Sequence, residues 1–239
     1  NRRYSINKMN EIERIKKAYE KRKEKQIDKI YSPFNIASLF ISHNREKELL
    51  RILKKFVGSK LSDKRILDVG CGSGGVLRDF IKYGAIPENL YGIDLLPDRI
   101  EKAKKLSPHI NFYLGSATEL PFEDEFFDIV MQFTVFTSIL DHSVKQKIAQ
   151  EMLRVLKPDG IIIWYDYWIS KPTNPDVKGV GKREIKKLFP NCKFEFHRIT
   201  LAPPIARLLV PISWILCELL EKLKIFNTHY LAIIKKPSS

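Results

Sequence analysis

Apolar and polar positions in the middle of the chain follow a repeating order of strand and helix. Short runs of consecutive apolar residues, typical of strands buried on both faces, alternate with longer stretches that carry apolar residues at helical spacing. The strand-like runs are Arg65–Val69, Asn89–Ile93, Asn111–Leu114, Phe127–Phe133 and Ile161–Tyr165. The helical stretches are the segment after Gly75 to about Tyr83, Pro97–Leu106 and Val144–Leu156. This order predicts an α/β fold in which helices cover both faces of a parallel sheet.

The segment before the first strand has a helical pattern of its own. Apolar residues between Glu11 and Ile30 recur at roughly helical spacing among many charges, which predicts a basic amphipathic helix with a narrow apolar stripe. The break Ser32-Pro33-Phe34-Asn35 ends this pattern, and a second helix is expected over Arg45–Phe56. We therefore expect residues 1–58 to form a basic helical extension and residues 59–239 to form the main domain.

The pattern at the C-terminal end changes again. Lys193–Thr200 and Thr228–Lys235 are strand-like, and the simplest arrangement makes them antiparallel neighbours. Between them lies an apolar insertion, residues 201–224, which three prolines interrupt. Its longest uncharged run is well short of the ~20 residues that cross a bilayer, so we do not expect a transmembrane helix. The sequence Lys157-Pro158-Asp159-Gly160 is expected to form a turn.

The charge of the chain favours anionic partners. Its 42 Lys and Arg outnumber its 28 Asp and Glu, giving a formal net charge of +14. Such an excess suits nucleic acid, an acidic membrane surface or phosphorylated substrates. In the first thirty residues, however, lysines alternate with glutamates, which is also typical of a solvated helix face.

Cysteine use and the N-terminal sequence bear on location. Cys71, Cys192 and Cys217 are widely spaced and form no zinc or disulfide pattern, so we expect a reducing, cytoplasmic setting. The first thirty residues lack the apolar core of a signal peptide. The chain begins at Asn1, and Met9 is a candidate natural start.

A glycine-rich turn follows the first strand. Asp68-Val69-Gly70-Cys71-Gly72-Ser73-Gly74-Gly75 contains the G-x-G-x-x-G spacing of dinucleotide sites and leads into a helix, whose free N–H groups suit an anionic group. Asp94 ends the next strand and can accept hydrogen bonds from ribose hydroxyls. Asp68 decides between cofactors, because a carboxylate would repel a pyrophosphate but attract an ammonium or sulfonium centre. The turn therefore favours S-adenosylmethionine over NAD.

Several motifs in order resemble those of class I S-adenosylmethionine-dependent methyltransferases, close to methyltransferase type 11. The resemblance covers about Arg65 to Tyr167. It is carried by Ile66-Leu67-Asp68-Val69-Gly70-Cys71-Gly72-Ser73-Gly74, Tyr91-Gly92-Ile93-Asp94-Leu95, Gly115-Ser116-Ala117-Thr118-Glu119-Leu120-Pro121-Phe122, Phe127-Asp128-Ile129-Val130 and Leu153-Arg154-Val155-Leu156-Lys157-Pro158-Asp159-Gly160. It implies a Rossmann-like, seven-stranded, mostly parallel sheet whose last strand is antiparallel.

The resemblance also implies a set of cofactor-binding residues. The methionine portion would contact Asp68, Gly70 and Gly72. The ribose and adenine would contact Asp94, Leu95, Ser116 and Ala117, although the family usually has an acid where Ser116 stands. Gln132 and Phe133, at the end of the fourth strand, would lie near the transferred methyl group.

The acceptor is less constrained by the sequence. Gln132-Phe133-Thr134-Val135 replaces the Asn/Asp-Pro-Pro-aromatic motif of enzymes that methylate base nitrogens, and aromatic residues gather at the strand ends. We expect an O-methyltransferase that acts on a small molecule or on a sugar of a glycan or glycolipid, similar to enzymes of surface-polysaccharide biosynthesis. The alternatives are a tRNA or rRNA methyltransferase and a non-catalytic protein that keeps the cofactor fold.

Two residues on loops after the fourth and fifth strands are candidates for a general base. His142 has the better unperturbed pKa, and Asp166 is the second candidate. No metal site is expected, with one alternative in which Asp166 and Asp141 hold a magnesium ion. We also expect the N-terminal helices and the insertion to cover the acceptor side of the cofactor. The apolar face of the insertion either packs on the domain core or docks onto an anionic membrane.

Overall fold

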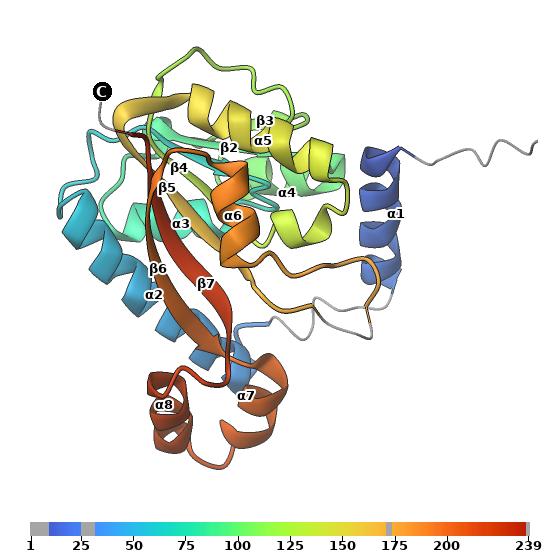
Figure 1. Ribbon diagram of the computed structural model, residues 1–239, viewed down its shortest axis with the longest axis vertical. Coiled ribbons are helices and arrows are strands. Elements are labelled where there is room, and N and C mark those ends of the chain that lie inside the picture. Colours follow the sequence, from blue (N-terminus) through green and yellow to red (C-terminus); the bar gives the residue numbers. More distant parts are fainter. Residues whose placement is uncertain (1–9, 25–31, 171–173, 238–239) are drawn as a thin grey trace, which may run out of the picture.

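A seven-stranded sheet in the order β3-β2-β1-β4-β5-β7-β6 forms the centre of the molecule (Figure 1). The computed structural model describes residues 10–24, 32–170 and 174–237. The strands are β1 (Ile66–Val69), β2 (Leu90–Asp94), β3 (Asn111–Leu114), β4 (Phe127–Phe133), β5 (Leu156–Tyr167), β6 (Lys193–Leu201) and β7 (Asn227–Lys235). The first five pair in parallel, and β7 runs antiparallel to both β5 and β6. The predicted mostly parallel sheet with an antiparallel last strand is confirmed.

Helices cover both faces of this sheet. The elements are α1 (Glu11–Glu24), α2 (Ile36–Phe56), α3 (Gly75–Lys82), α4 (Pro97–Leu106), α5 (His142–Arg154), α6 (Lys182–Leu188), α7 (Pro203–Leu209) and α8 (Trp214–Lys222), with short 3₁₀ turns η2 (Pro87–Asn89) and η3 (Phe136–Ser138). One core joins the sheet to α2, α3 and α4, and a second joins its other face to α5 and α6. The inner strands β1, β2, β4, β5 and β7 are mostly buried on both sides, which explains their apolar runs, whereas the edge strands β3 and β6 are partly exposed.

A third, smaller core joins α2 to the insertion. Phe40 of α2 is fully buried there beside Ala206 of α7 and Cys217 of α8. The insertion is therefore a pair of short helices that follows the carboxyl end of β6 and packs on the first half of α2. In Figure 1 this pair projects from one end of the molecule.

The structure corrects three of the predicted boundaries. The second helix begins at Ile36, nine residues earlier than predicted, because the Asn35 side chain accepts hydrogen bonds from the N–H groups of Ala37 and Ser38. The helix α5 begins at His142 because Asp141 caps it in the same way. The predicted turn at residues 157–160 is instead the start of β5, where an irregularity in its pairing with β4 accommodates Pro158. The predicted first helix is confirmed up to Glu24, and the rest of its range lies outside the described residues.

Candidate active site

The glycine turn after β1 has the conformation that its sequence requires. Gly70 has a φ of +73° and Gly72 a φ of +55°, in the left-handed region that favours glycine. A Cβ at Gly70 would lie 2.4 Å from Cγ2 of Val135, which follows β4. The turn therefore brings the backbones after β1 and β4 together at the carboxyl edge of the sheet, where ligands bind in open α/β folds.

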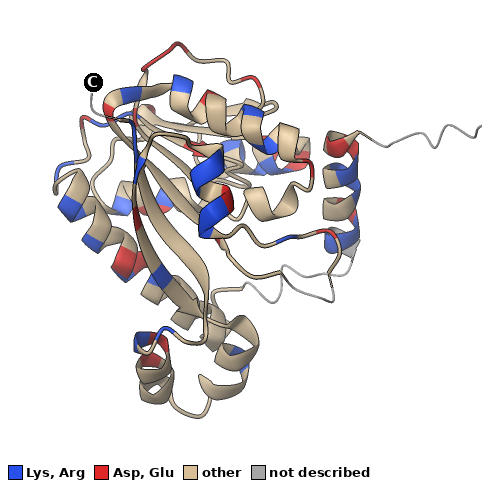
Figure 2. Ribbon diagram, in the orientation of Figure 1, with Lys and Arg blue, Asp and Glu red and all other residues tan. Residues whose placement is uncertain are grey.

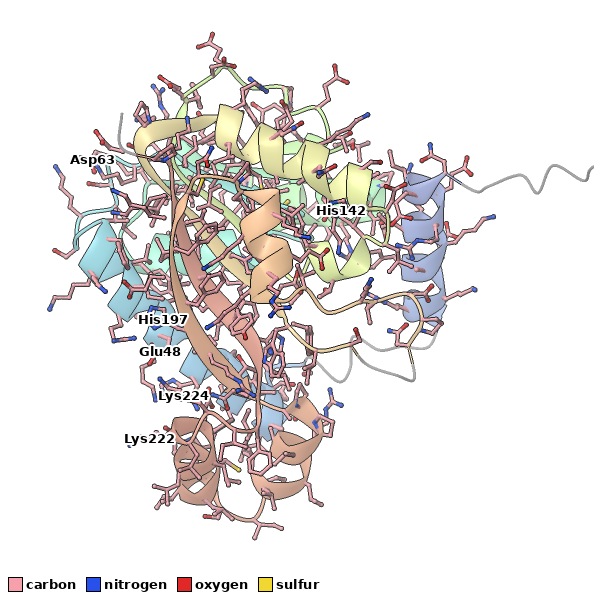
Figure 3. All side chains as sticks on the ribbon, in the orientation of Figure 1. Glu48, Asp63, His142, His197, Lys222 and Lys224 are labelled. Atoms are coloured by element: carbon pink, nitrogen blue, oxygen red, sulfur yellow. The ribbon has the colours of Figure 1, made fainter. Side chains whose placement is uncertain are left out.

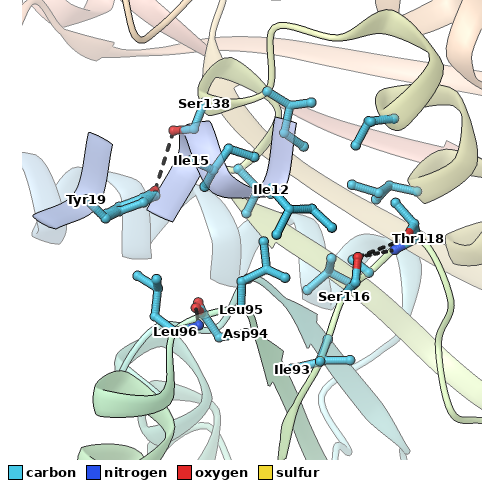
Figure 4. A pocket seen from close by; sticks show the side chains of 18 of the residues that line it. Ile12, Ile15, Tyr19, Ile93, Asp94, Leu95, Leu96, Ser116, Thr118 and Ser138 are labelled. Atoms are coloured by element: carbon cyan, nitrogen blue, oxygen red, sulfur yellow. Dashed lines mark hydrogen bonds between the residues drawn. The ribbon is translucent and has the colours of Figure 1, made fainter. Parts of the chain in front are cut away.

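A pocket opens at this edge between the sheet and α1. Figure 4 shows α1 crossing the pocket, with Ile12, Ile15 and Tyr19 on one side and Asp94 and Leu95 on the other. The pocket measures about 800 Å³ including its open mouth. Its wall comes from the ends of β1, β2 and β4 and from the loop after β3; of the residues predicted to bind the cofactor, it contains Gly70, Asp94, Leu95, Ser116, Ala117 and Phe133.

Polar contacts fasten α1 over the pocket. The Glu11 carboxylate accepts a hydrogen bond of 2.6 Å from the Leu140 N–H and pairs with Arg14 at 2.8 Å. Arg14 in turn donates to the carbonyl oxygen of Ser138. The Tyr19 ring lies under the Arg99 guanidinium, 4.4 Å from the ring centroid. These contacts hold α1, which we call the lid, against the segment between η3 and α5. Because that segment is distant from α1 in sequence, the sequence pattern predicted an amphipathic helix but not its position over the pocket.

Asp94 is positioned to bind a ribose. Its Oδ2 accepts a hydrogen bond of 2.9 Å from the Gly72 N–H, and its Oδ1 accepts one of 3.0 Å from the Leu96 N–H. A carboxylate oxygen accepts more than one hydrogen bond, so both atoms keep capacity for a pair of hydroxyl donors. These contacts also place Gly72, which does not line the pocket itself, against the Asp94 carboxylate.

Asp68 is a buried carboxyl group that lacks a partner. It is 1% exposed, and its Oδ1 has no hydrogen bond among the described residues. Burial raises its pKa well above the usual value, the charge of Asp94 raises it further, and Arg45 opposes both. Native proteins rarely leave such an atom unsatisfied, so this atom points to a ligand with a donor group.

Arg45 of α2 supplies the opposite charge, and sequence reasoning missed it. Its guanidinium lies 5.5 Å from the ring centroids of both Phe133 and Tyr165, and no described carboxylate forms an ion pair with it. Neither Asp68 nor Arg45 is among the residues that line the pocket, but their opposite charges suit the ammonium and carboxylate of an amino acid, as Asp94 suits a ribose. This donor and acceptor set fits S-adenosylmethionine, whose methionine end carries both charges.

The remaining predicted cofactor residue has an indirect role. Gln132 is fully buried, and its Oε1 accepts a hydrogen bond of 3.0 Å from the Val135 N–H. It therefore shapes the turn after β4, where Thr134 has a φ of +59°. At the opposite end of the pocket, the Ser116 hydroxyl is 2.8 Å from that of Thr118, leaving Ala117 and Leu95 as the apolar surface for an adenine.

The two predicted bases lie away from the pocket lining. His142 is exposed on the first turn of α5 (Figure 3). Asp166 is fully buried, and its carboxylate accepts hydrogen bonds from the Thr137 N–H, the Thr137 hydroxyl and the Tyr167 N–H. Burial raises the pKa of Asp166 to about 7, although these hydrogen bonds lower it. Asp166 therefore holds η3 onto β5, while Asp141 caps α5, so the two carboxylates serve different segments.

A row of rings leads away from the pocket across the sheet. Phe133 lies 5.5 Å from Tyr165, and Tyr165 stacks on His229 at 4.7 Å with an interplanar angle of 5°. Burial and, to a smaller extent, the charge of Arg45 together lower the pKa of His229 to about 3, so the imidazole is neutral near pH 7. Phe133 is the member of this row that lines the pocket.

Comparisons with known proteins agree with this geometry. A family model described as a methyltransferase domain matches residues 67–164. Demethylmenaquinone methyltransferase of Staphylococcus haemolyticus is 31% identical over 178 residues, covering 70% of this chain and 72% of that protein. Norajmaline N-methyltransferase of Rauvolfia serpentina is 30% identical over 152 residues, covering 60% of this chain and 50% of that protein. The chain spans about half the length of several curated relatives that it matches.

The fold is also similar to solved structures. An S-adenosylmethionine-dependent methyltransferase of Methanosarcina mazei superimposes with a TM-score of 0.57 at 18% identity, covering 78% of this chain and 97% of that one. At this identity the similarity concerns the fold alone.

Proposed function

Because the chain belongs to the class I S-adenosylmethionine-dependent methyltransferases, we propose that it transfers a methyl group to the hydroxyl of a small aromatic acceptor of the phenol or quinol class. When bound, S-adenosylmethionine supplies a methyl group on a sulfonium that is already a strong electrophile. The work left to the chain is to align donor and acceptor, which supplies ~7–11 kcal/mol in well-oriented reactions.

Three charged groups would hold the donor in place. The Asp68 carboxylate accepts from the ammonium, Arg45 donates to the carboxylate, and Asp94 accepts from the ribose hydroxyls. Leu95 and Ala117 would pack on the adenine, with Ile12, Ile15 and Tyr19 of α1 on the other side of the pocket. These residues would hold the cofactor at both ends, and Phe133 would be the aromatic side chain near the transferred methyl group.

The observation that carries the acceptor class is the lining of the pocket. Among its described residues the only carboxylate is Asp94, whose place is at the ribose, and neither His142 nor Asp166 belongs to it. An acceptor hydroxyl must then release its proton to water. Aromatic hydroxyls ionise near pH 10, as tyrosine does, and far more readily than sugar hydroxyls do. Within the aromatic row, Tyr165 and His229 are buried, and it is the partly exposed Phe133 that offers its ring to an aromatic acceptor.

The name of one relative supports this class, and that of another does not. One relative is named for demethylmenaquinone, a quinone, and another for N-methylation. Since an ionised phenol or quinol reacts at oxygen or at a ring carbon, the position of the methyl group is an outcome of the test below.

The test is a transfer assay with trideuteromethyl-labelled cofactor and separate panels of phenols and quinols, sugars, amines and tRNA. We expect label in the phenol and quinol panel, bound to oxygen by mass spectrometry. Label on a ring carbon would show that the methyl group goes to carbon and not to the hydroxyl oxygen. Label only in sugars, amines or tRNA would refute the proposal.

A matched pair of variants tests the acceptor position. Phe133→Ala should raise the acceptor KM at least tenfold while the cofactor Kd stays within about threefold. Phe126→Ala, just before the opposite end of β4, is the control and should change neither. An unchanged acceptor KM in Phe133→Ala would contradict the placement.

A further inference from the structure

The helix pair α7–α8 exposes an apolar surface that the domain core does not use. Eight large apolar residues of this segment are 41–74% exposed, and we call them the hairpin surface: Leu208, Ile212, Ile215, Leu216, Leu219, Leu223, Ile225 and Phe226. Monomeric proteins rarely expose large contiguous apolar patches, and those that do use them for binding.

The opposite side of the helix pair is firmly packed. Trp214 meets Phe40 of α2 edge-on, with 5.0 Å between ring centroids, and Cys217 is fully buried. Ile205, Leu209 and Leu220 pack against the same small core. From the sequence, the apolar face of this segment was expected either to pack on the domain core or to dock onto a membrane. In the structure, one side of the helix pair packs on the domain and the other side faces solvent. The hairpin surface is therefore held outward on a fixed base.

The acidic and basic residues of the helix pair lie on different sides. Both glutamates of α8 point to α2: Glu221 accepts a hydrogen bond of 2.8 Å from Asn44, and Glu218 pairs with Lys47 at 3.3 Å. The cations Arg207, Lys222 and Lys224 are exposed and form no ion pair with the described residues. Figures 2 and 3 show basic residues on the flank of the pair, with Lys222 and Lys224 between the apolar end and the main body.

The apolar region continues onto the neighbouring helix. The start of α2 packs against α7. Phe34, just before α2, is 98% exposed, and Ile36 and Leu39 are each 47% exposed. An apolar end with cations set behind it is the pattern of a segment that lies in a membrane interface with its lysines at the level of the headgroups.

We propose that the hairpin surface docks onto an anionic lipid bilayer. The inward-facing glutamates, the free cations at its margin and the net charge of +14 favour anionic headgroups over an uncharged protein surface. No described helix is long and apolar enough to cross a membrane, so the contact is peripheral. The helix pair follows the carboxyl end of β6, at the same sheet edge as the pocket, and docking would turn that edge toward the bilayer.

The direct test is flotation of the full chain with vesicles of phosphatidylcholine, with or without one third phosphatidylglycerol. We expect binding to the anionic vesicles that weakens with added salt. The double variant Ile212→Ser, Ile215→Ser should lose at least tenfold in binding. Its control is Leu106→Ser, Leu114→Ser, which changes two similarly exposed apolar residues near the other edge of the sheet and should bind as the unmodified chain does.

A charge variant and a size measurement complete the test. Lys222→Glu, Lys224→Glu should lose binding to anionic vesicles, whereas Lys104→Glu, Lys105→Glu on α4 should keep most of it. Cofactor titration should be unchanged in all four variants, which shows that they fold. Equal vesicle binding by all variants, or a dimer in light scattering that Ile212→Ser, Ile215→Ser abolishes, would overturn the proposal, the latter in favour of a second copy of the chain.

Discussion

Asp68 illustrates how a binding residue can work against stability. Its carboxyl group is buried with one unsatisfied oxygen, so the folded chain holds it at a raised pKa. A raised pKa in the folded state means that its stabilising contribution is greatest below the unfolded pKa of 3.8 and is lost as the pH rises. The ligand's ammonium is the group that would satisfy it.

Asp68→Asn should therefore separate stability from binding. At pH 8 we expect the variant to melt about 4 °C higher than the unmodified chain, as ~1–2 kcal/mol would give in a domain of this size. At pH 4 the difference should be small. Cofactor affinity should fall at least tenfold, because the amide attracts an ammonium much less than a carboxylate does. Scanning calorimetry at both pH values and titration calorimetry measure the two effects, and a variant that is less stable at pH 8 would contradict the assignment.

The contribution of His229 to folding stability depends on pH in the opposite direction to that of Asp68. Its pKa is about 3 in the folded chain against an ordinary 6.5, so its stabilising contribution is complete above pH 6.5 and is lost as the pH falls toward 3. At pH 5 the unfolded chain binds a proton that the folded chain does not, which costs about 2 kcal/mol.

Urea unfolding at pH 7.5 and pH 5 tests this linkage. The loss of unfolding free energy between the two pH values should be about 2 kcal/mol smaller in His229→Gln. The exposed His142→Gln is the control and should show the same loss as the unmodified chain. An identical loss in His229→Gln would mean that the imidazole is protonated in the fold.

Local motifs in the sequence predicted the cofactor residues, and six of the nine line one pocket; that they bind the cofactor stays a prediction. Gly70, Asp94 and Ala117 occupy the strand ends that the motifs predict, and the structure places them in one pocket. Arg45 and His229 belong to no motif, and only the packing of α2 and β7 brings them to this edge. The prediction of His142 and Asp166 relied on loop position alone, which cannot distinguish a capped helix start or a buried hydrogen-bonding carboxylate from an exposed base.

The elements were predictable where periodicity was strong. Asn111–Leu114, Phe127–Phe133 and Pro97–Leu106 match the structure residue for residue. The start of α2 was missed because Ile36–Asn44 is apolar on two sides: Ala37 and Phe40 pack with the helix pair α7–α8, whereas Ile36 and Leu39 are exposed. Such a segment lacks the single polar face that marks a surface helix.

The position of the helix α1 over the pocket predicts that its contacts slow the release of the cofactor. Glu11 connects α1 to the segment before α5, so Glu11→Ala should loosen the lid and raise the cofactor dissociation rate about tenfold, as the loss of charged hydrogen bonds worth ~1.5 kcal/mol does. The exposed Glu13 makes no such contact, and Glu13→Ala is the control. Stopped-flow displacement of bound cofactor measures both rates; equal rates would mean that α1 does not retain the cofactor.

At the scale of the whole molecule, one edge of the sheet gathers the functional features. The pocket, the aromatic row and the helix pair α7–α8 all lie at the carboxyl ends of the strands. The sequence predicted this edge from the order of strands and helices, and it predicted that appendages would gather there. It did not predict that the two appendages have different roles, with α1 covering the pocket and α7–α8 facing outward, since both have amphipathic patterns.

The central claim is that this edge binds S-adenosylmethionine through Asp68, Arg45 and Asp94. Titration calorimetry of the unmodified chain and of Asp94→Ala, each with S-adenosylmethionine and with NAD, tests it most directly. We predict that the unmodified chain binds S-adenosylmethionine and not NAD, and that Asp94→Ala loses about ten- to hundredfold in affinity, as expected for removing hydrogen bonds worth ~1.5–3 kcal/mol. Unchanged affinity in Asp94→Ala, or a preference of the unmodified chain for NAD, would contradict the account.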